Sequence, residues 1–332
     1  MKNNKTKRNL ITYAEAIREG TDQAMDLDHR IFVMGQLVDY APGVFGTTSK
    51  LVEKYGKDRV RDFPVSESAM TAAAIGAAVT GMRPILVHHR LDFMIYAMDA
   101  IVNWMALWRF KSNGECSLPL VIRVVVGKGW GQGPQHSKSL HGWFAHLPGI
   151  KVIMPSNAYD AKGMLLESIL GENPVIIIEH RSLFGIKENV PEIPYRVRLG
   201  SAAIRRQGAD ITLVAMGLMV NFAEEVSDQL IKHEIYAEVV DLRTISPIDT
   251  ETIITSVTKT KRVCVLDPGW SSFGVSAEIL AMIAEKCHLI LEAAPIRIAY
   301  PDSHTPMSQA LESEYYPDKS KVVAEILKIF KI

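Results

Sequence analysis

Glu67 is the residue whose place in this sequence points most directly to chemistry. It follows residues 63–66 and opens a helical stretch, residues 68–82, that consists mainly of small side chains such as alanine and glycine. A carboxylate in the first turn of a helix is stabilised in its ionised form by the helix dipole, and it could hold a proton on a ring nitrogen of a ligand. A glutamate here also serves as an ordinary dipole-compensating cap, so the residues alone leave both interpretations open.

His136 is the second candidate group, and it ends a glycine-rich segment. Residues 127–133 contain four glycines, so the segment can bend freely and lie close to a ligand. Imidazole titrates near neutral pH, which makes His136 the strongest acid–base candidate in the chain. A surface or capping role stays open for it, although His141 and His146 follow closely.

Short apolar runs precede both candidates and are typical of strands buried on both faces. Such runs occupy residues 30–35, 84–88, 118–126, 152–155 and 174–179, with helical patterns at 66–80, 93–110 and 158–171. The alternation predicts a parallel sheet with crossover helices. Ligands of such sheets collect at the carboxyl ends of strands. We therefore expect Glu67 and the loops after Leu86 and Val126 at one edge.

A second alternating set of elements follows in the other half of the chain. Strands are expected at 211–216, 237–241 and 262–266, and helices at 220–233, 250–257, 275–286 and 317–330. Residues 186–197 contain Pro191 and Pro194 among charged neighbours and are expected to form a linker. The fold class expected is α/β, with two doubly wound domains that comprise residues 1–195 and 196–332.

The composition argues against several classes of function. The 37 basic and 37 acidic side chains leave no basic excess, so no nucleic-acid partner is expected. No signal-peptide core and no run of 18 apolar residues occurs, so we expect no membrane association and a cytoplasmic location. The cysteines, which lack metal-ligand spacing, indicate buried thiols in a reducing compartment; they are Cys116, Cys264 and Cys287. Phosphate-binding glycine motifs are absent, so a phosphorylated cofactor would need another chain for its phosphate end.

Several motifs, in order along nearly the whole chain, resemble one known family. They include Val65-Ser66-Glu67, Gly81-Met82-Arg83-Pro84, Gln135-His136-Ser137, Asn173-Pro174-Val175, Asp241-Leu242-Arg243-Thr244 and Ala294-Pro295-Ile296-Arg297. They are similar to the beta subunit of thiamine-diphosphate-dependent 2-oxo acid dehydrogenases, the pyruvate dehydrogenase-type decarboxylating component. The resemblance implies a pyrimidine-binding, transketolase-like domain followed by a transketolase C-terminal-like domain.

The resemblance also implies roles for single residues. Glu67 would hydrogen-bond the aminopyrimidine ring of thiamine diphosphate and so promote loss of the thiazolium proton, after which the cofactor acts as the electron sink for decarboxylation. His136 would guide the substrate and donate protons in later steps. Phe93 would pack on the pyrimidine ring, although a core aromatic at a helix start is an equally open interpretation. Gln36 and His89 would line the cofactor pocket.

Partners and ions are implied in the same way. An alpha subunit would hold the diphosphate and Mg²⁺, so this chain would supply half an active site in a heterotetramer of two alpha and two beta chains. A small 2-oxo acid would be the substrate, with a lipoyl acyltransferase core as a further partner that receives the acyl unit. A potassium ion is expected near Leu120, Ser168 and Asn173, where Gly171 replaces an acidic ligand and Glu172 offers a substitute.

Two departures from the family pattern keep other functions open. Gln36 stands where the family has an acidic residue, and an amide can hydrogen-bond but cannot relay a proton. His88, His89 and Arg90 stand where the family is mostly apolar, and His89, Arg90 and His136 are expected to contact the substrate.

Three basic side chains would suit a polar or anionic substrate. A two-component transketolase-like transferase of acyl or ketol units to a sugar-like acceptor is therefore one alternative. That only one of the three points inward, with the others in salt bridges, is an equally open interpretation. A catalytically silent regulatory or scaffold partner is the other alternative, although the retained pair Glu67 and His136 argues against it.

Overall fold

The chain folds into two compact units. The computed structural model describes residues 8–129 and 131–331, so Trp130 of the glycine-rich segment lies outside the described residues. Unit 1 comprises the described residues up to Val126 together with residues 146–199, and unit 2 comprises residues 127–145 and the chain from Gly200 onward. The glycine-rich segment thus interrupts unit 1 in the sequence but makes its contacts within unit 2.

Unit 1 contributes a run of parallel strands in the order β6-β7-β5-β4-β2-β3. These are β2 (Ile31–Gly35), β3 (Val60–Asp62), β4 (Arg83–His88), β5 (Val121–Val126), β6 (Lys151–Ile153) and β7 (Val175–His180). Every residue of β2, β4, β5 and β7 is buried, as continuous apolar runs require of strands covered on both faces. The expectation of a parallel sheet is confirmed.

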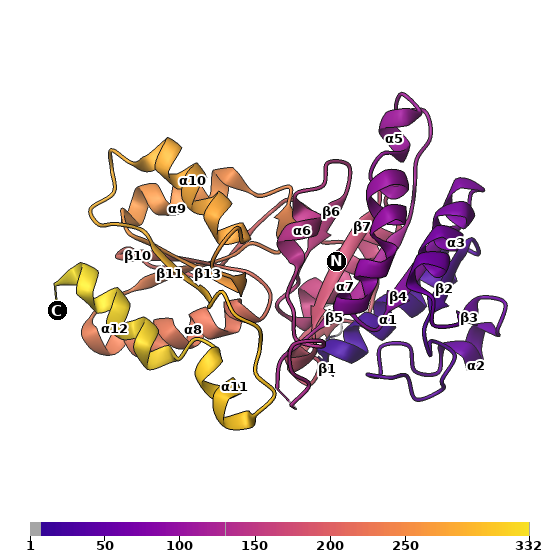
Figure 1. Ribbon diagram of the computed structural model, residues 1–332, viewed down its shortest axis with the longest axis horizontal. Helices are drawn as coiled ribbons and strands as arrows, with labels where there is room; N and C mark the ends of the chain where they lie inside the picture. Colours follow the sequence, from indigo (N-terminus) through magenta and orange to yellow (C-terminus); the bar gives the residue numbers. More distant parts are fainter. Residues whose placement is uncertain (1–7, 130, 332) are drawn as a thin grey trace, which may run out of the picture. The chain divides into compact units, whose positions relative to one another are not determined.

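The helices of unit 1 pack in two groups (Figure 1). They are α1 (Tyr13–Leu27), α2 (Leu51–Tyr55), α3 (Glu67–Val79), α4 (Leu91–Met94), η1 (Ile95–Ala97), η2 (Ala100–Met105), α5 (Trp108–Lys111), α7 (Ala158–Ile169) and η3 (Arg181–Leu183). Helix α1 packs against α7, and α3 packs against β4, η1 and η2. Helix α1 starts at a capping box, in which Thr12 and Glu15 each bind the other's backbone N–H.

Two expectations for unit 1 are wrong. Residues 93–110 are not one helix, because they divide among α4, the 3₁₀ turn η1, the π-helix η2 and α5. The spacing of apolar side chains does not distinguish these hydrogen-bond registers. Residues 186–197 are not simply a linker, because β8 (Lys187–Pro191) pairs antiparallel with β1 (Arg8–Thr12). Charged side chains in this exposed two-stranded ribbon hide the strand pattern.

Unit 2 has its own sheet, in the order β14-β13-β10-β11-β9, parallel except for β9. Its strands are β9 (Ala203–Arg206), β10 (Ile211–Ala215), β11 (Ala237–Asp241), β13 (Val263–Trp270) and β14 (Ile296–Tyr300), with the short β12 (Thr244–Ser246) elsewhere. Its helices are α6 (His141–Ala145), α8 (Leu218–Leu230), η4 (Ile231–His233), α9 (Thr250–Thr260), α10 (Val275–Cys287), α11 (Gln309–Tyr315) and α12 (Lys319–Phe330). Helices α8 and α12 lie on one side of this sheet, and α9 and α10 on the other (Figure 1).

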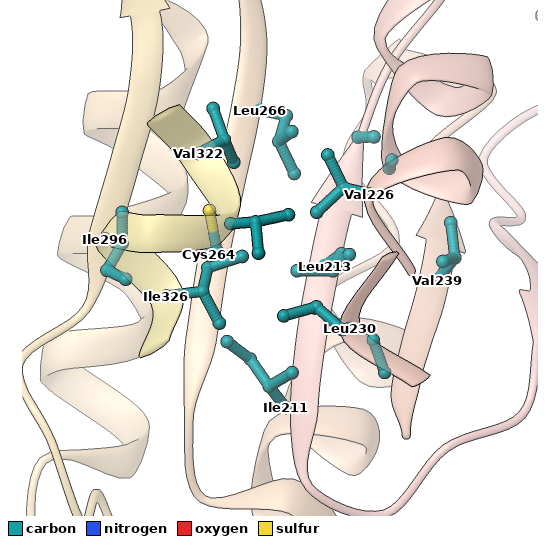
Figure 2. Packing of buried hydrophobic residues seen from close by; sticks show 14 of the residues in the cluster. Ile211, Leu213, Val226, Leu230, Val239, Cys264, Leu266, Ile296, Val322 and Ile326 are labelled. Carbon is teal, nitrogen blue, oxygen red and sulfur yellow. The ribbon is translucent and has the colours of Figure 1, made fainter. Parts of the chain in front are cut away.

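The core beneath α8 and α12 fixes the closing helix to the sheet. Figure 2 shows Val322 and Ile326 of α12 packed with Leu230 of α8 and Leu213 of β10. Cys264 lies in this core as a free, buried thiol, whereas Cys116 is exposed, against the expectation that all three thiols are buried. No helix in the part of the chain that the structure describes is long and apolar enough to cross a membrane.

Candidate functional site

The position of Gln36 is set by the glycine that ends β2. Gly35 has a φ of +146°, and a Cβ there would lie 2.2 Å from the carbonyl oxygen of Val87. Only glycine therefore lets β2 end this close to β4. The backbone N–H of Gln36 donates to the same carbonyl over 3.4 Å. This places Gln36 at the carboxyl edge of the sheet, where ligands of parallel sheets bind.

Gln36 joins Glu67 to the backbone of His89. Its Nε2 donates to Oε1 of Glu67 over 3.0 Å, and its Oε1 accepts the backbone N–H of His89 over 3.3 Å. Because a backbone N–H can only donate, the amide orientation is fixed and its NH₂ group must face the carboxylate. The structure thus brings together three residues that the sequence assigns to the cofactor site.

Glu67 keeps hydrogen-bonding capacity for a ligand. It is the first residue of α3, and no side chain of Ser66 caps this helix. The Glu67 side chain is buried, and within residues 8–129 and 131–331 Gln36 is its one hydrogen-bond donor. A carboxylate can accept about four hydrogen bonds. The second oxygen is therefore available to a donor from outside the chain.

The residues that follow β4 carry much less positive charge than the sequence suggests. His88 is fully buried, with Nε2 3.1 Å from Oγ1 of Thr71, and burial and the adjacent His89 lower the pKa of His88 to about 3. Burial, followed by positive neighbours that include Arg90, lowers the pKa of His89 to about 4. Arg90 is itself buried, with Nε 3.4 Å from Oδ2 of Asp92. Neutral imidazoles and a paired guanidinium remove the main reason to expect a sugar-like or anionic acceptor.

His89 offers a polar atom that the described residues leave without a partner. Its ring meets Phe45 edge-on at a centroid distance of 5.6 Å, and the guanidinium of Arg181 lies 5.0 Å from the Phe45 ring centre. Its Nδ1 is buried and has no hydrogen-bond partner among the residues that the structure describes. Buried polar atoms are nearly always paired, so an unpaired one beside Gln36 suits a ligand contact.

Phe93 and His136 fall in different units. Phe93 lies in α4, half-buried, in the same unit as Glu67. His136 is half-buried in the segment 127–145 and belongs to unit 2.

The groups expected to bind potassium already accept hydrogen bonds. The carbonyl of Leu120 accepts from Val175 N–H at 3.0 Å, that of Ser168 accepts from Gly171 N–H at 3.3 Å, and Oδ1 of Asn173 accepts from Nη1 of Arg109 at 2.8 Å. Arg83 brings a positive charge to the same loop, because its guanidinium donates to the carbonyls of Ile169 and Gly171 and pairs with Glu172 at 2.9 Å. These oxygen atoms therefore suit a guanidinium, which donates hydrogen bonds, better than a bare metal cation. Among the described residues, no three His, Cys, Asp or Glu side chains form a metal-binding group.

Sequence reasoning misses two buried pairs of polar side chains. Arg123 of β5 donates to Glu179 of β7 through two bonds of 2.6 and 3.0 Å, with both side chains 1% exposed. His141 lies 2.8 Å from Asp267, also in full burial. The sequence does contain a signal for the first pair: each of two neighbouring apolar strands carries a single charged residue, and a buried charge needs a partner. For the second, 126 residues separate the partners.

Comparison with known proteins gives the family. Residues 9–187 match the transketolase pyrimidine binding domain, and residues 200–322 match the transketolase C-terminal domain. The chain is 37% identical to the pyruvate dehydrogenase E1 component subunit beta of Bacillus subtilis, over 97% of this chain and 99% of the relative. It is 39% identical to the acetoin:2,6-dichlorophenolindophenol oxidoreductase subunit beta of Cupriavidus necator, over 95% and 96%.

A solved structure described as a split gene transketolase, an inactive beta4 tetramer, has the same fold. Its TM-score is 0.78 at 22% identity, over 97% of this chain and 99% of that one. The chain belongs to the transketolase-type family of 2-oxo acid dehydrogenase E1 beta subunits, whose cofactor is thiamine diphosphate. The family and fold expectations are confirmed, and the sugar-transferase and scaffold alternatives are not favoured.

Proposed function

We propose that this chain supplies the cofactor-activating half of a two-component 2-oxo acid dehydrogenase that works with thiamine diphosphate. The observation that carries the proposal is the buried Glu67 carboxylate at the carboxyl edge of the sheet, oriented by Gln36 and with one oxygen left for a donor. Thiamine diphosphate supplies the electron sink for decarboxylation. Glu67 holds a proton at a ring nitrogen of the aminopyrimidine. Its carboxylate suits this role because it can still accept a hydrogen bond.

The neighbouring residues orient the cofactor and the substrate. Gln36 keeps the Glu67 carboxylate in one rotamer, because both ends of its amide are bound. The unpaired Nδ1 of His89 provides a hydrogen-bonding atom for cofactor or substrate. Phe93 packs on the pyrimidine ring, and Arg90 and His136 contact the substrate, with His136 donating a proton in later steps.

An alpha subunit completes the assembly as two alpha and two beta chains. Both curated relatives are named as beta subunits. Helix α3 exposes small side chains along its outer face, and exposed apolar residues such as Val65 and Phe110, 81% and 86% accessible, lie in the same unit. Such surface suits a permanent partner. A lipoyl acyltransferase core then receives the acyl group, and the complex works in the cytoplasm.

The proposed ions differ in importance. Mg²⁺ belongs with the diphosphate on the alpha subunit, because this chain has no phosphate-binding glycine motif. A potassium ion near Leu120, Ser168 and Asn173 contributes little, since Arg83 already donates hydrogen bonds to the carbonyls at the end of α7.

Replacement of Glu67 by Gln tests the proposal. In the assembled alpha–beta complex, exchange of the thiazolium C2 proton with deuterium, followed by NMR, should slow by roughly 10²- to 10⁴-fold, because a positioned acid or base contributes about that much. Glu53→Gln, in the first turn of the exposed helix α2, is the matched control and should leave the rate unchanged. An unchanged rate in Glu67→Gln would contradict the proposal. Pyruvate and acetoin as substrates distinguish the two activities named for the relatives.

A further inference from the structure

The segment that carries His136, residues 127–145, which we call the histidine loop, begins with a glycine-rich stretch. Gly129, Gly131 and Gly133 all have positive φ values, of +83°, +65° and +62°. Glycines in this region cost more conformational entropy to hold in one conformation than other residues. A fixed place for His136 therefore requires contacts from outside the loop. Every contact described below lies within unit 2.

The start of the loop is bound by α11 and the residues on either side of it. Oε1 of the buried Glu312 accepts the N–H of Gly129 over 2.7 Å. Lys128 lies with its Nζ 4.3 Å from the ring centre of Tyr316, and burial lowers the pKa of Lys128. A Cβ at Gly133 would lie 3.4 Å from the side chain of Met307, so the loop passes close to that residue.

The end of the loop is bound through His141, the first residue of α6. Its Nε2 lies 2.8 Å from Oδ1 of Asp267, a completely buried carboxylate that also accepts the N–H groups of Gly269 and Ser276 at 2.8 Å each. Burial alone would raise the pKa of Asp267, but His141 and the backbone donors outweigh it and leave this pKa below its ordinary value. An ionised carboxylate only accepts, so Nε2 of His141 carries the proton. The other ring nitrogen lies 3.1 Å from Oγ of Ser139.

The arrangement of Ser139, His141 and Asp267 has the connectivity of a nucleophilic triad, but it is not placed as one. The His141 side chain is 1% exposed, and a Cβ at Gly269 would lie 3.0 Å from its Cε1. No substrate can reach a ring packed this tightly. The pair of His141 and Asp267 instead attaches the loop to unit 2. The free-energy cost of burying the Asp267 carboxylate is offset by His141 only when the loop is in place.

We propose that His141, held by Asp267, is a positioning residue that fixes the histidine loop and thereby the place of His136 during catalysis. His136 lies five residues before His141 and between the two attachments. The inference rests on the proposed function for the role of His136. The attachment itself does not depend on that function, because it is a matter of packing within unit 2.

Hydrogen–deuterium exchange of the full-length chain tests the attachment directly. His141→Leu leaves Asp267 buried without its side-chain donor, so backbone amides of peptides from 127–145 should exchange about tenfold faster or more. His141→Gln places an amide NH₂ where Nε2 was and should restore exchange to within about threefold of the wild type. Glu238→Gln is the matched control, because Glu238 is a buried carboxylate of unit 2 that pairs with Lys259. It should leave these peptides unchanged.

A milder substitution tests the attachment even if His141→Leu misfolds. Ser139→Ala keeps the bond to Asp267 and removes only the second partner of the imidazole, so exchange should rise by about two- to threefold. Unchanged exchange of residues 127–145 in both Ser139→Ala and His141→Leu would overturn the attachment.

Kinetics of the assembled complex, with pyruvate and acetoin as probes, test the link to His136. His141→Leu should lower kcat about tenfold while the KM for thiamine diphosphate changes less than about twofold, and His141→Gln should recover most of the loss. A loop that opens in the exchange experiment while kcat stays at the wild-type value would overturn the positioning role. Failure of the proposed function is a different result, since it would appear as a wild-type complex that does not activate the cofactor at all.

Discussion

Each unit of this chain places a buried carboxylate beside the start of a helix, and the two carboxylates differ in how fully they are satisfied. Glu67 begins α3 and receives one hydrogen bond from this chain, from Gln36, as far as the described residues show. Asp267 lies near the start of α10 and receives three, from His141, Gly269 and Ser276. Similar placement near a helix dipole therefore does not mean similar use.

The number of donors separates a structural carboxylate from a reactive one. Both carboxylate oxygens of Asp267 accept hydrogen bonds from its own chain, so this group holds the fold together. Glu67 retains an oxygen for a ligand and so remains free to act on it. A pair of acids that share burial and a helix terminus can thus be assigned different roles from their hydrogen-bond partners alone.

Truncation of the satisfied carboxylate should give the largest effect on stability. Asp267→Ala leaves a buried imidazole and two buried N–H groups without an acceptor, so the free energy of unfolding should fall by about 3–5 kcal/mol. Glu67→Gln keeps an acceptor for Nε2 of Gln36 and should change it by less than about 1 kcal/mol. Urea unfolding followed by circular dichroism measures both. Equal losses would break the comparison.

Acid should destabilise unit 1 through His88. Its folded pKa of about 3 lies below the unfolded value of 6.5, so the unfolded chain binds more protons between these values and stability falls as pH drops below 6.5. At pH 5 the loss from this residue is about 2 kcal/mol relative to pH 7. His88→Gln retains a hydrogen-bonding group toward Thr71 and should lack that part of the loss. Urea midpoints at pH 7 and pH 5 compare the two, and equal pH dependence would contradict the assignment.

A second carboxylate beside Glu67 should shift the pH profile of catalysis. Gln36→Glu puts two carboxylates about 3.0 Å apart, and like charges raise the apparent pKa of such a pair. The acidic limb of kcat against pH should move upward by about one unit or more. Gln23→Glu is the control, because it also adds a carboxylate beside an existing one: Nε2 of Gln23 lies 3.2 Å from Oε1 of Glu19 on α1. A profile that shifts equally in both variants would show that the effect does not come from Glu67.

Exchange of potassium for sodium should have the smallest effect. The end of α7 resembles Asp267 in being satisfied by its own chain, here through Arg83. The Tm should therefore change by less than about 2 °C. Arg83→Gln should make the Tm depend on potassium, and thermal scans in the two salts compare the variants. A large change in the Tm of the wild-type protein would show that the potassium ion, rather than the Arg83 guanidinium, satisfies the carbonyls of this loop.

Much of the fold can be predicted because its strands are buried on both faces. Runs such as Val121–Val126 read as strands without any partner information. Lys187–Pro191 does not, because its charged side chains lie in an exposed ribbon whose partner begins at Arg8. The π-helix at Ala100–Met105 is likewise invisible, since side-chain spacing carries no hydrogen-bond register.

The site divides in the same way. From the sequence, Glu67 and the loop after Leu86 are expected at one edge of the sheet, where ligands gather, and the family resemblance adds Gln36 and His89 to the cofactor site. The charge of His88 and His89 cannot, because it depends on burial that only the packed structure supplies. The contact of His141 with Asp267 joins two segments 126 residues apart, and the sequence of neither segment indicates that they meet.

The polypeptide passes between its two units three times, after Val126, after Ala145 and after Leu199. A fragment that started at Gly200 would contain the whole sheet of unit 2, but Asp267 would lack its contact with His141 and Glu312 would lack the N–H of Gly129. A synthetic peptide of residues 127–145 supplied separately would then be a ligand of that fragment. We therefore expect the chain from Gly200 onward to be less stable without residues 127–145, and an exchange of unit 2 between related subunits to need both segments.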